Sequence, residues 1–176
     1  LAQTGTGKTA AFTLPILQRL LKGPQRRMRA LVVAPTRELA EQNVQTSVTL
    51  GTNSKVRCVA VYGGVSKKNQ ASQIRKGVEL VIACPGRLLD LVGDGDIDLS
   101  QTEVLVLDEA DRMCDMGFIP DIRRIIKLLP SKRQTLFFAA TMPEDIRKLT
   151  NNILRDPVKV QIGTISPAKS VSHALY

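Results

Sequence analysis

Aromatic residues are scarce in this chain of 176 residues, which has no tryptophan, two tyrosines and four phenylalanines. Modules that read single-stranded RNA base by base stack the bases on aromatic side chains, so we do not expect that mode of recognition here. The chain also lacks an apolar run long enough to cross a bilayer and a basic-then-apolar leader. We therefore expect neither a membrane span nor secretion.

Cysteine and histidine are rare as well. Cys58, Cys84 and Cys114 are scattered without a C-x-x-C pair, and His173 is the only histidine. This pattern argues against a disulfide framework and against a zinc site. We expect a reducing compartment, the cytoplasm by default or the nucleus if the source is eukaryotic.

Positive charge is in excess, with 25 lysines and arginines against 16 aspartates and glutamates and a net charge of +9. A polyanionic partner would explain this excess. A surface that is charged only for solubility explains it equally well, so the charge alone leaves both interpretations open.

Five short apolar runs alternate with polar or amphipathic segments, and 43% apolar content is enough for one domain with a buried core. The runs are Ala30 to Ala34, Cys58 to Tyr62, Leu80 to Cys84, Val104 to Leu107 and Leu136 to Ala140. Strands that alternate with helical segments predict an α/β fold, in which helices cover a parallel sheet.

The start of the chain, Ala2 to Thr9, has the pattern of a phosphate-binding loop with alanine in place of the first glycine. Thr4, Gly5, Thr6 and Gly7 would bring backbone N–H groups close to a polyphosphate, and Lys8 would reach its outer phosphates. Thr9 would place its hydroxyl on Mg²⁺. This pattern predicts a nucleoside triphosphate and Mg²⁺ as ligands, whereas a glycine-rich turn that merely caps a helix is the plainer alternative.

Acidic residues follow the apolar run Val104 to Leu107, in the order Asp108-Glu109-Ala110-Asp111. Ligands of open α/β sheets bind at the carboxyl ends of the strands, where these residues are expected. Asp108 would hold Mg²⁺, partly through water, and Glu109 would orient and deprotonate the attacking water. A solvated loop is the alternative.

Two further strand ends carry residue types that suit phosphate contacts. Pro35-Thr36-Arg37 and Cys84-Pro85-Gly86-Arg87 each follow a predicted strand, and they combine an arginine with a hydroxyl or a glycine N–H. Each segment is also explained as a plain strand-to-helix turn.

These segments form a series of motifs in a characteristic order, to which Gly63-Gly64 and Ala139-Ala140-Thr141 also belong. Together with Pro35-Thr36-Arg37-Glu38-Leu39-Ala40 they make nearly the whole chain resemble the first RecA-like domain of DEAD-box RNA helicases. The resemblance implies a P-loop NTPase domain with three α/β/α layers around a mostly parallel sheet. Residues 1–162 would form this domain, without its first strand and its adenine-recognition segment, and residues 163–176 a linker toward a second RecA-like domain.

The resemblance also implies roles for individual residues. Lys8, Asp108 and Glu109 would be catalytic, and Asp111, Ala139 and Thr141 would couple nucleotide state to strand separation. The backbone of single-stranded RNA would be held, without dependence on its sequence, by Pro35, Thr36, Arg37, Gly63, Gly64, Pro85, Gly86 and Arg87. The parent protein would then hydrolyse ATP to unwind short RNA duplexes.

Two residues depart from the family pattern. Ala139 stands where serine is usual, so a hydroxyl expected to bond Asp111 is missing, and Cys84 stands where threonine is usual. We hypothesise that ATP hydrolysis survives the alanine better than unwinding does. Without the arginine finger of a second domain, which contributes about 10³ to 10⁵ in rate, this chain alone is expected to be nearly inactive.

Two other functions stay open at this point. In one, the chain is a clamp that binds RNA without hydrolysing ATP, and RNA affinity would then be independent of nucleotide. In the other, it is a P-loop ATPase that acts on DNA or protein, and a competition between RNA and DNA would reveal this through the 2′-hydroxyl.

Overall fold

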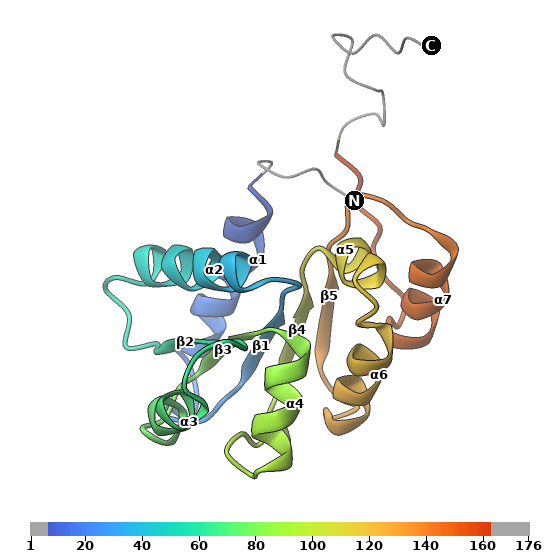
Figure 1. The fold of residues 1–176 in the computed structure, drawn as a ribbon. Helices are drawn as coiled ribbons and strands as arrows, with labels where there is room; N and C mark the ends of the chain where they lie inside the picture. The colour runs from blue at the N-terminus through green and yellow to red at the C-terminus, as the bar shows by residue number, and fades with distance from the viewer. Residues whose placement is uncertain (1–6, 163–176) are drawn as a thin grey trace, which may run out of the picture.

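A computed structural model describes residues 7–162, which form one sheet with helices on both faces (Figure 1). The strands are β1 (Ala30–Val33), β2 (Cys58–Val61), β3 (Leu80–Ala83), β4 (Val104–Leu107) and β5 (Gln134–Phe137). The helices are α1 (Lys8–Leu20), α2 (Arg37–Leu50), α3 (Lys67–Arg75), α4 (Pro85–Gly93), α5 (Ala110–Asp115), α6 (Ile119–Leu128) and α7 (Glu144–Ile153). The predicted linker, residues 163–176, lies outside the described residues.

The five strands lie in the order β2-β3-β1-β4-β5, and every neighbouring pair is parallel. Their last residues are in register, because Val33 pairs with both Ala83 and Leu107, and Leu107 pairs with Phe137. The segments that follow the strands therefore leave the sheet at one common edge. This confirms the predicted α/β fold, and among the described strands the sheet is wholly rather than mostly parallel.

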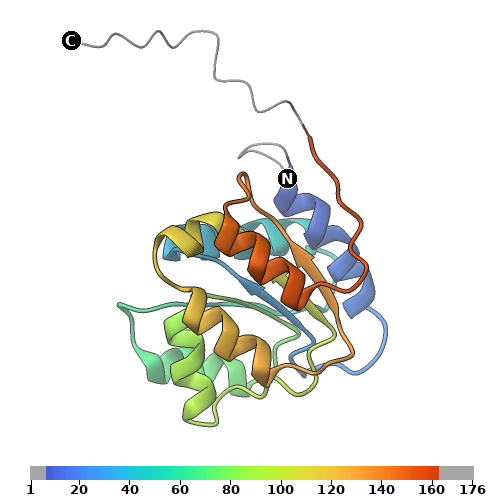
Figure 2. The same ribbon diagram turned by 90° about the vertical axis from the view of Figure 1, so that its right-hand side faces the viewer.

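One apolar core lies on each face of the sheet, between the strands and the helices that cover them. Helices, sheet and helices thus form the predicted three layers (Figure 2). Phe12, Ile16 and Leu20 of α1, together with α2, cover the face that carries Val32 and Val106. Helices α3 to α7 cover the opposite face, to which Leu31 and the other alternate residues point. Strands with both faces covered read as continuous apolar runs, which explains why the runs at β1, β3 and β4 were recognisable in the sequence.

The fifth strand differs from its prediction. The apolar run suggested Leu136 to Ala140, but the strand comprises Gln134–Phe137. β5 is at the edge of the sheet and only half-buried, so its first residues are polar and do not contribute to an apolar run. Consequently Ala139 and the residues after it belong to the loop beyond the strand.

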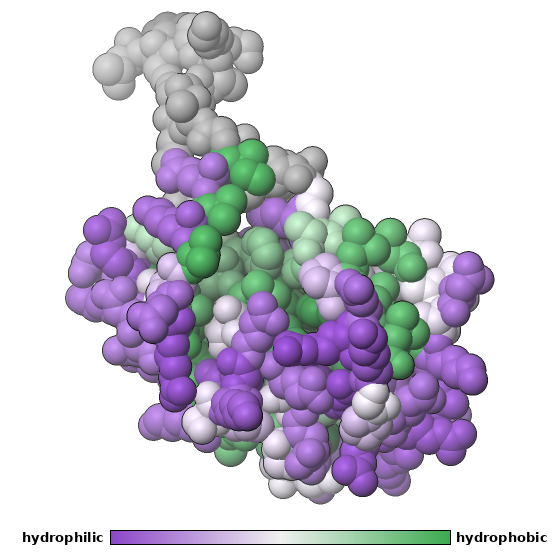
Figure 3. Space-filling model, turned by 180° about the vertical axis from the view of Figure 1, so that it is seen from behind, coloured by the Kyte–Doolittle hydropathy of each residue, from purple (hydrophilic) through white to green (hydrophobic). Residues whose placement is uncertain are grey.

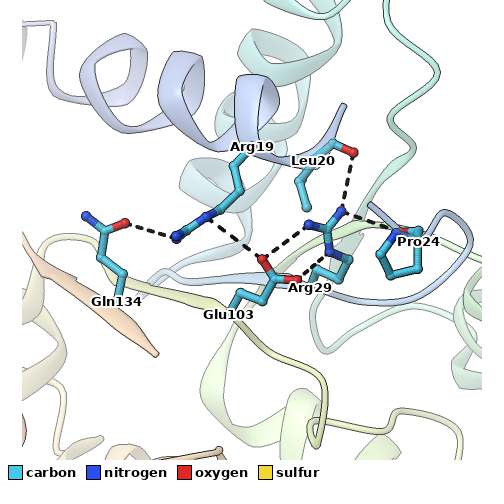
Figure 4. Close-up of polar contacts among 6 residues, drawn as sticks. All are labelled: Arg19, Leu20, Pro24, Arg29, Glu103 and Gln134. Atoms are coloured by element: carbon cyan, nitrogen blue, oxygen red, sulfur yellow. Dashed lines mark hydrogen bonds and ion pairs between the residues drawn. The ribbon is translucent and has the colours of Figure 1, made fainter. Parts of the chain in front are cut away.

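A cluster of polar contacts around Arg29 lies at the other end of the strands, where β1 and β4 begin (Figure 4). Arg29, which is 5% exposed, donates hydrogen bonds from Nε and Nη2 to the two carboxylate oxygens of Glu103, at 2.6 and 3.2 Å. Its Nη1 donates to the carbonyl oxygens of Leu20 and Pro24, both at 3.4 Å. The cluster joins the starts of β1 and β4 to the end of α1.

The surface seen in Figure 3 is largely hydrophilic, but apolar side chains gather near the end of the described chain. Val158, Val160 and Ile162 are exposed and alternate there with polar residues. Residues 152–158, Val160 and Ile162, together with β5 and the start of α1, line a groove of about 690 Å³. No helix in residues 7–162 combines the length and the apolar character needed to span a bilayer.

Candidate nucleotide and nucleic-acid site

The common edge at the carboxyl ends of the strands brings together the predicted motifs. The segments that follow β1, β2, β3, β4 and β5 carry, in turn, Thr36, Gly63, Gly86, Asp108 and Ala139. Residues more than one hundred positions apart in the sequence thus lie along one edge of the sheet, beside the beginning of α1.

The described part of the phosphate loop leads directly into helix α1. Gly7 precedes the helix with a φ of 80°, a left-handed conformation that glycine adopts without strain, and its carbonyl accepts a hydrogen bond from the N–H of Ala11. Lys8 and Thr9 form the first turn, and the N–H groups and the positive end of the dipole at a helix N-terminus favour an anion. Thr4, Gly5 and Thr6 lie outside the described residues.

Asp108 is the most buried of the predicted catalytic residues, at 2% exposure. Its Oδ2 accepts a hydrogen bond of 3.0 Å from Nδ2 of Asn43, whose Oδ1 in turn accepts one of 3.3 Å from the hydroxyl of Thr9. Burial raises the pKa of the Asp108 carboxyl, although the Asn43 hydrogen bond and the charge of Lys8 oppose the shift. The two predicted metal ligands, Thr9 and Asp108, are therefore connected through one buried amide.

Glu109, next to Asp108, has an unusual backbone for a residue that is not glycine. Its φ is 50° and its ψ is 51°, and it directly precedes α5. Such conformations cost free energy and concentrate at functional sites. The Glu109 carboxylate is mostly buried and lies 3.3 Å from Nη1 of Arg112.

Asp111 connects the acidic motif to the loop after β5. Its Oδ2 accepts hydrogen bonds from the N–H of Ala140 at 3.1 Å and from both the N–H and the hydroxyl of Thr141, at 2.8 and 2.9 Å. Ala139, at 1% exposure, packs in the core. Asp111 and Thr141 are thus hydrogen-bonded to each other, and Asp111 has partners despite the alanine at position 139.

The loops predicted to bind RNA are tied together by hydrogen bonds. Arg87 donates from Nη1 to the carbonyl of Val65 at 3.1 Å and to Oε1 of Gln70 at 3.4 Å. Gln70 in turn donates from Nε2 to the carbonyl of Tyr62 at 3.0 Å. The mostly buried Arg87 therefore supports the segment that carries Gly63 and Gly64.

Backbone and side-chain groups of the other predicted RNA-binding residues differ in exposure. Gly63, Gly64 and Gly86 are exposed, and Gly64 has a φ of 81°. Pro35 and Pro85 are buried and shape the turns. Thr36 caps α2 by accepting a hydrogen bond from the N–H of Leu39 at 3.3 Å, and the Arg37 side chain is exposed.

Sequence reasoning did not identify Asn43, Glu41 or Tyr62 as members of the site. The sequence contains one weak signal for Asn43. It is a polar residue on the same side of α2 as Ala40 and Ser47, the side that is buried, and a buried polar side chain needs a hydrogen-bond partner. Glu41 and Tyr62 meet only in the fold, where they contact each other and Arg37.

Comparison with known proteins identifies the chain's relatives. Residues 1–149 match the family model for DEAD/DEAH box helicases. The chain is 48% identical to ATP-dependent RNA helicase DBP3 of Lodderomyces elongisporus, over 92% of this chain and 30% of that protein. It is 49% identical to dbp3 of Schizosaccharomyces pombe, over 97% of this chain and 30% of the relative. The chain thus spans less than a third of the length of these curated relatives.

Two solved structures have the same fold. The yeast DEAD-box splicing factor Prp28 aligns with a TM-score of 0.84 and 32% identity, over 93% of this chain and 41% of Prp28. A hypothetical ATP-dependent RNA helicase of Sulfolobus tokodaii aligns with a TM-score of 0.80 and 43% identity, over 88% of this chain and 44% of the other. The chain belongs to the DEAD/DEAH box helicase family and has the RecA-like fold of its DEAD-box members.

Proposed function

We propose that this chain is the ATP-binding domain of an ATP-dependent RNA helicase. In this proposal it binds Mg·ATP between the start of α1 and the end of β4, and the backbone of single-stranded RNA along the neighbouring loops. The observation that carries the proposal is the link from Thr9 through Asn43 to Asp108, because it joins the phosphate loop to the acidic motif in one buried arrangement.

The residues at this position suit a hydrated Mg²⁺ ion and a polyphosphate. Magnesium prefers oxygen ligands, and the Thr9 hydroxyl and the Asp108 carboxylate are of that kind. A buried carboxylate is also a group that gains from a cation nearby. Bound Mg²⁺ would neutralise charge on the phosphate oxygens, while the N–H groups and Lys8 at the start of α1 hold the phosphates in place.

Glu109 is the residue that we propose orients the attacking water and accepts its proton. In the parent protein a second RecA-like domain would complete the site and supply an arginine. Because such an arginine contributes about 10³ to 10⁵ in rate, the isolated chain should bind nucleotide but hydrolyse it slowly. Asp111 and Thr141, which are hydrogen-bonded, would transmit the nucleotide state to the second domain.

The RNA half of the proposal rests on the exposed residues Gly63, Gly64 and Gly86, which would offer backbone N–H groups, and on the exposed residue Arg37, which would offer its guanidinium. These groups recognise phosphate and sugar rather than base edges. Thr36 and Pro35 would hold the loop after β1 in position. Arg87 and Pro85 would do the same for the loop after β3. Binding should therefore be independent of sequence and sensitive to salt.

A thermal melt with and without Mg·ADP tests the nucleotide site, since a ligand that binds only the folded state raises the melting temperature. We expect ADP to stabilise the wild type and Lys22→Ala, which removes an exposed lysine just beyond α1, but not Lys8→Ala. If ADP raised the melting temperature of Lys8→Ala as much as that of Lys22→Ala, the result would contradict the proposed phosphate site.

RNA binding is tested with labelled oligouridylate and an equally long oligodeoxyuridylate as competitor, with and without a non-hydrolysable ATP analogue. We expect RNA to win the competition and the analogue to raise RNA affinity. Equal competition would indicate an ATPase that acts on DNA, and RNA affinity that ignores nucleotide would indicate a clamp without turnover.

A further inference from the structure

Arg37, which we propose binds an RNA phosphate, already faces a carboxylate. Its Nε lies 3.2 Å from Oε1 of Glu41, one turn further along α2. The same oxygen accepts a hydrogen bond of 2.5 Å from the hydroxyl of Tyr62, and the Arg37 guanidinium lies 4.9 Å from the centre of the Tyr62 ring. Three side chains thus form one cluster between α2 and the segment that leads to Gly63.

Glu41 is a charged competitor at this position. The hydrogen bond from Tyr62 and the positive charge of Arg37 lower the pKa of the Glu41 carboxyl, so it is ionised at neutral pH. The Tyr62 hydroxyl holds its oxygen beside the guanidinium, which limits the carboxylate's freedom to move away.

The pair can nevertheless be opened. The side chains of Arg37 and Glu41 are 50% and 46% exposed, and ion pairs in such exposed positions contribute little to stability. A phosphate offers the guanidinium the same kind of charged oxygen acceptors. A phosphate bound to Arg37 would also lie close to Glu41, and two anions so close repel each other.

We infer that Glu41 is an internal counter-ion of Arg37 that an RNA phosphate must displace, so that Glu41 weakens the grip of this loop on RNA. The inference rests on the proposed RNA-binding function. In this inference Glu41 controls how strongly the loop after β1 holds the RNA backbone, and Tyr62 positions Glu41.

The test compares Glu41→Gln with Glu38→Gln in the 176-residue chain. Glutamine keeps the length and an acceptor oxygen for Tyr62 but removes the charge. Glu38 lies on the exposed side of the same helix and takes no part in the Arg37–Tyr62 contacts, so its variant controls for net charge. Thermal melts serve as the folding control: both variants should have the melting temperature of the wild type.

For Glu41→Gln we expect the Kd for oligouridylate at low salt to fall about fivefold, because the repulsion between two unit charges about 4 Å apart in water corresponds to a factor of about that size. The plot of log Kd against log salt should also steepen by about 0.7, as one more phosphate contact becomes effective. Glu38→Gln should change Kd by less than about twofold.

Arg37→Ala and the double variant Arg37→Ala/Glu41→Gln separate the possible failures. We expect Arg37→Ala to weaken binding and the double variant to show no gain over it. If Arg37→Ala weakens binding but Glu41→Gln leaves it unchanged or weaker, the inference is overturned and the RNA-binding proposal stands. If the wild type binds RNA and no variant differs from it, Arg37 makes no contact with RNA and the inference is overturned. If the wild type does not bind RNA, the RNA-binding proposal is overturned as well.

Discussion

Asp111 and Thr141 are joined by two hydrogen bonds to a single carboxylate oxygen, although 30 residues separate them in the sequence. A third bond to that oxygen comes from the N–H of Ala140. The oxygen therefore connects the start of α5 to the loop after β5.

Thr141→Val should weaken this connection, because it removes the hydroxyl and keeps the two N–H donors. We expect a loss of about 1 kcal/mol in the free energy of unfolding, typical of one hydrogen bond, whereas Thr141→Ser should lose little. Urea unfolding of both variants measures the difference. Equal stability of the valine and serine variants would show that the hydroxyl bond contributes nothing.

Ala139→Ser tests the hypothesis that the missing hydroxyl limits unwinding. The substitution should raise the number of RNA duplexes unwound per ATP hydrolysed in the full-length parent, measured side by side with its ATPase rate. Ala140→Ser, which adds the same hydroxyl to an exposed neighbour, is the control. Because Asp111 already accepts hydrogen bonds from three donors, any gain must come from an additional bond. An unchanged ratio would refute the hypothesis.

Asn43→Ala should destabilise the domain and impair its response to nucleotide. The change removes the hydrogen bond to the buried Asp108 carboxylate and the link to Thr9, and an unpaired buried polar group costs about 2 kcal/mol. Gln42→Ala, on the exposed side of the same helix, should have little effect. Melts with and without Mg·ADP measure both consequences, and a full ADP shift in Asn43→Ala would mean that the link is dispensable for binding.

Arg29→Ala should destabilise the fold far more than Arg19→Ala, although both arginines face Glu103. Arg29 is buried and makes two short contacts to the carboxylate, so we expect a loss of about 3 kcal/mol in the free energy of unfolding. Arg19 is half exposed and its Nε lies 3.9 Å from Glu103 Oε2, so its removal should cost less than about 1 kcal/mol. Similar losses in urea unfolding would argue against a special role for Arg29.

Cys58 and Cys84 should react slowly with iodoacetamide in the folded chain. Burial raises the pKa of each thiol from 9.0 to about 11, and only the thiolate reacts. At pH 8 the folded chain should therefore be alkylated about 100-fold more slowly at these positions than the urea-unfolded chain, as mass spectrometry of peptides can show.

The raised pKa values of the two thiols also make the stability of the fold depend on pH. The unfolded chain loses the thiol protons near pH 9, whereas the folded chain holds them to about pH 11. The stabilisation is complete below pH 9 and is lost as the pH rises to 11, so the melting temperature should fall over this range. A Cys58→Ala/Cys84→Ala variant should show a smaller fall.

The sequence alone determined the fold class and the position of most motifs along the chain. Buried parallel strands require contiguous apolar residues, so Val104 to Leu107 was recognised with its correct bounds, and β1 and β3 were found to within one residue. Functional roles could be predicted for Lys8, Asp108 and Arg37 because each belongs to a short motif with a local pattern.

Tertiary structure decided which side chains meet those motif residues. Asn43 contacts Asp108 across 65 residues, and Tyr62 reaches Glu41 across 21. No periodicity within a helix or strand encodes such pairs, because they depend on which strands adjoin and on where each strand ends. The edge strand β5 was misplaced for a related reason: with one side unpaired it tolerates polar residues, and only its register with β4 fixes its bounds.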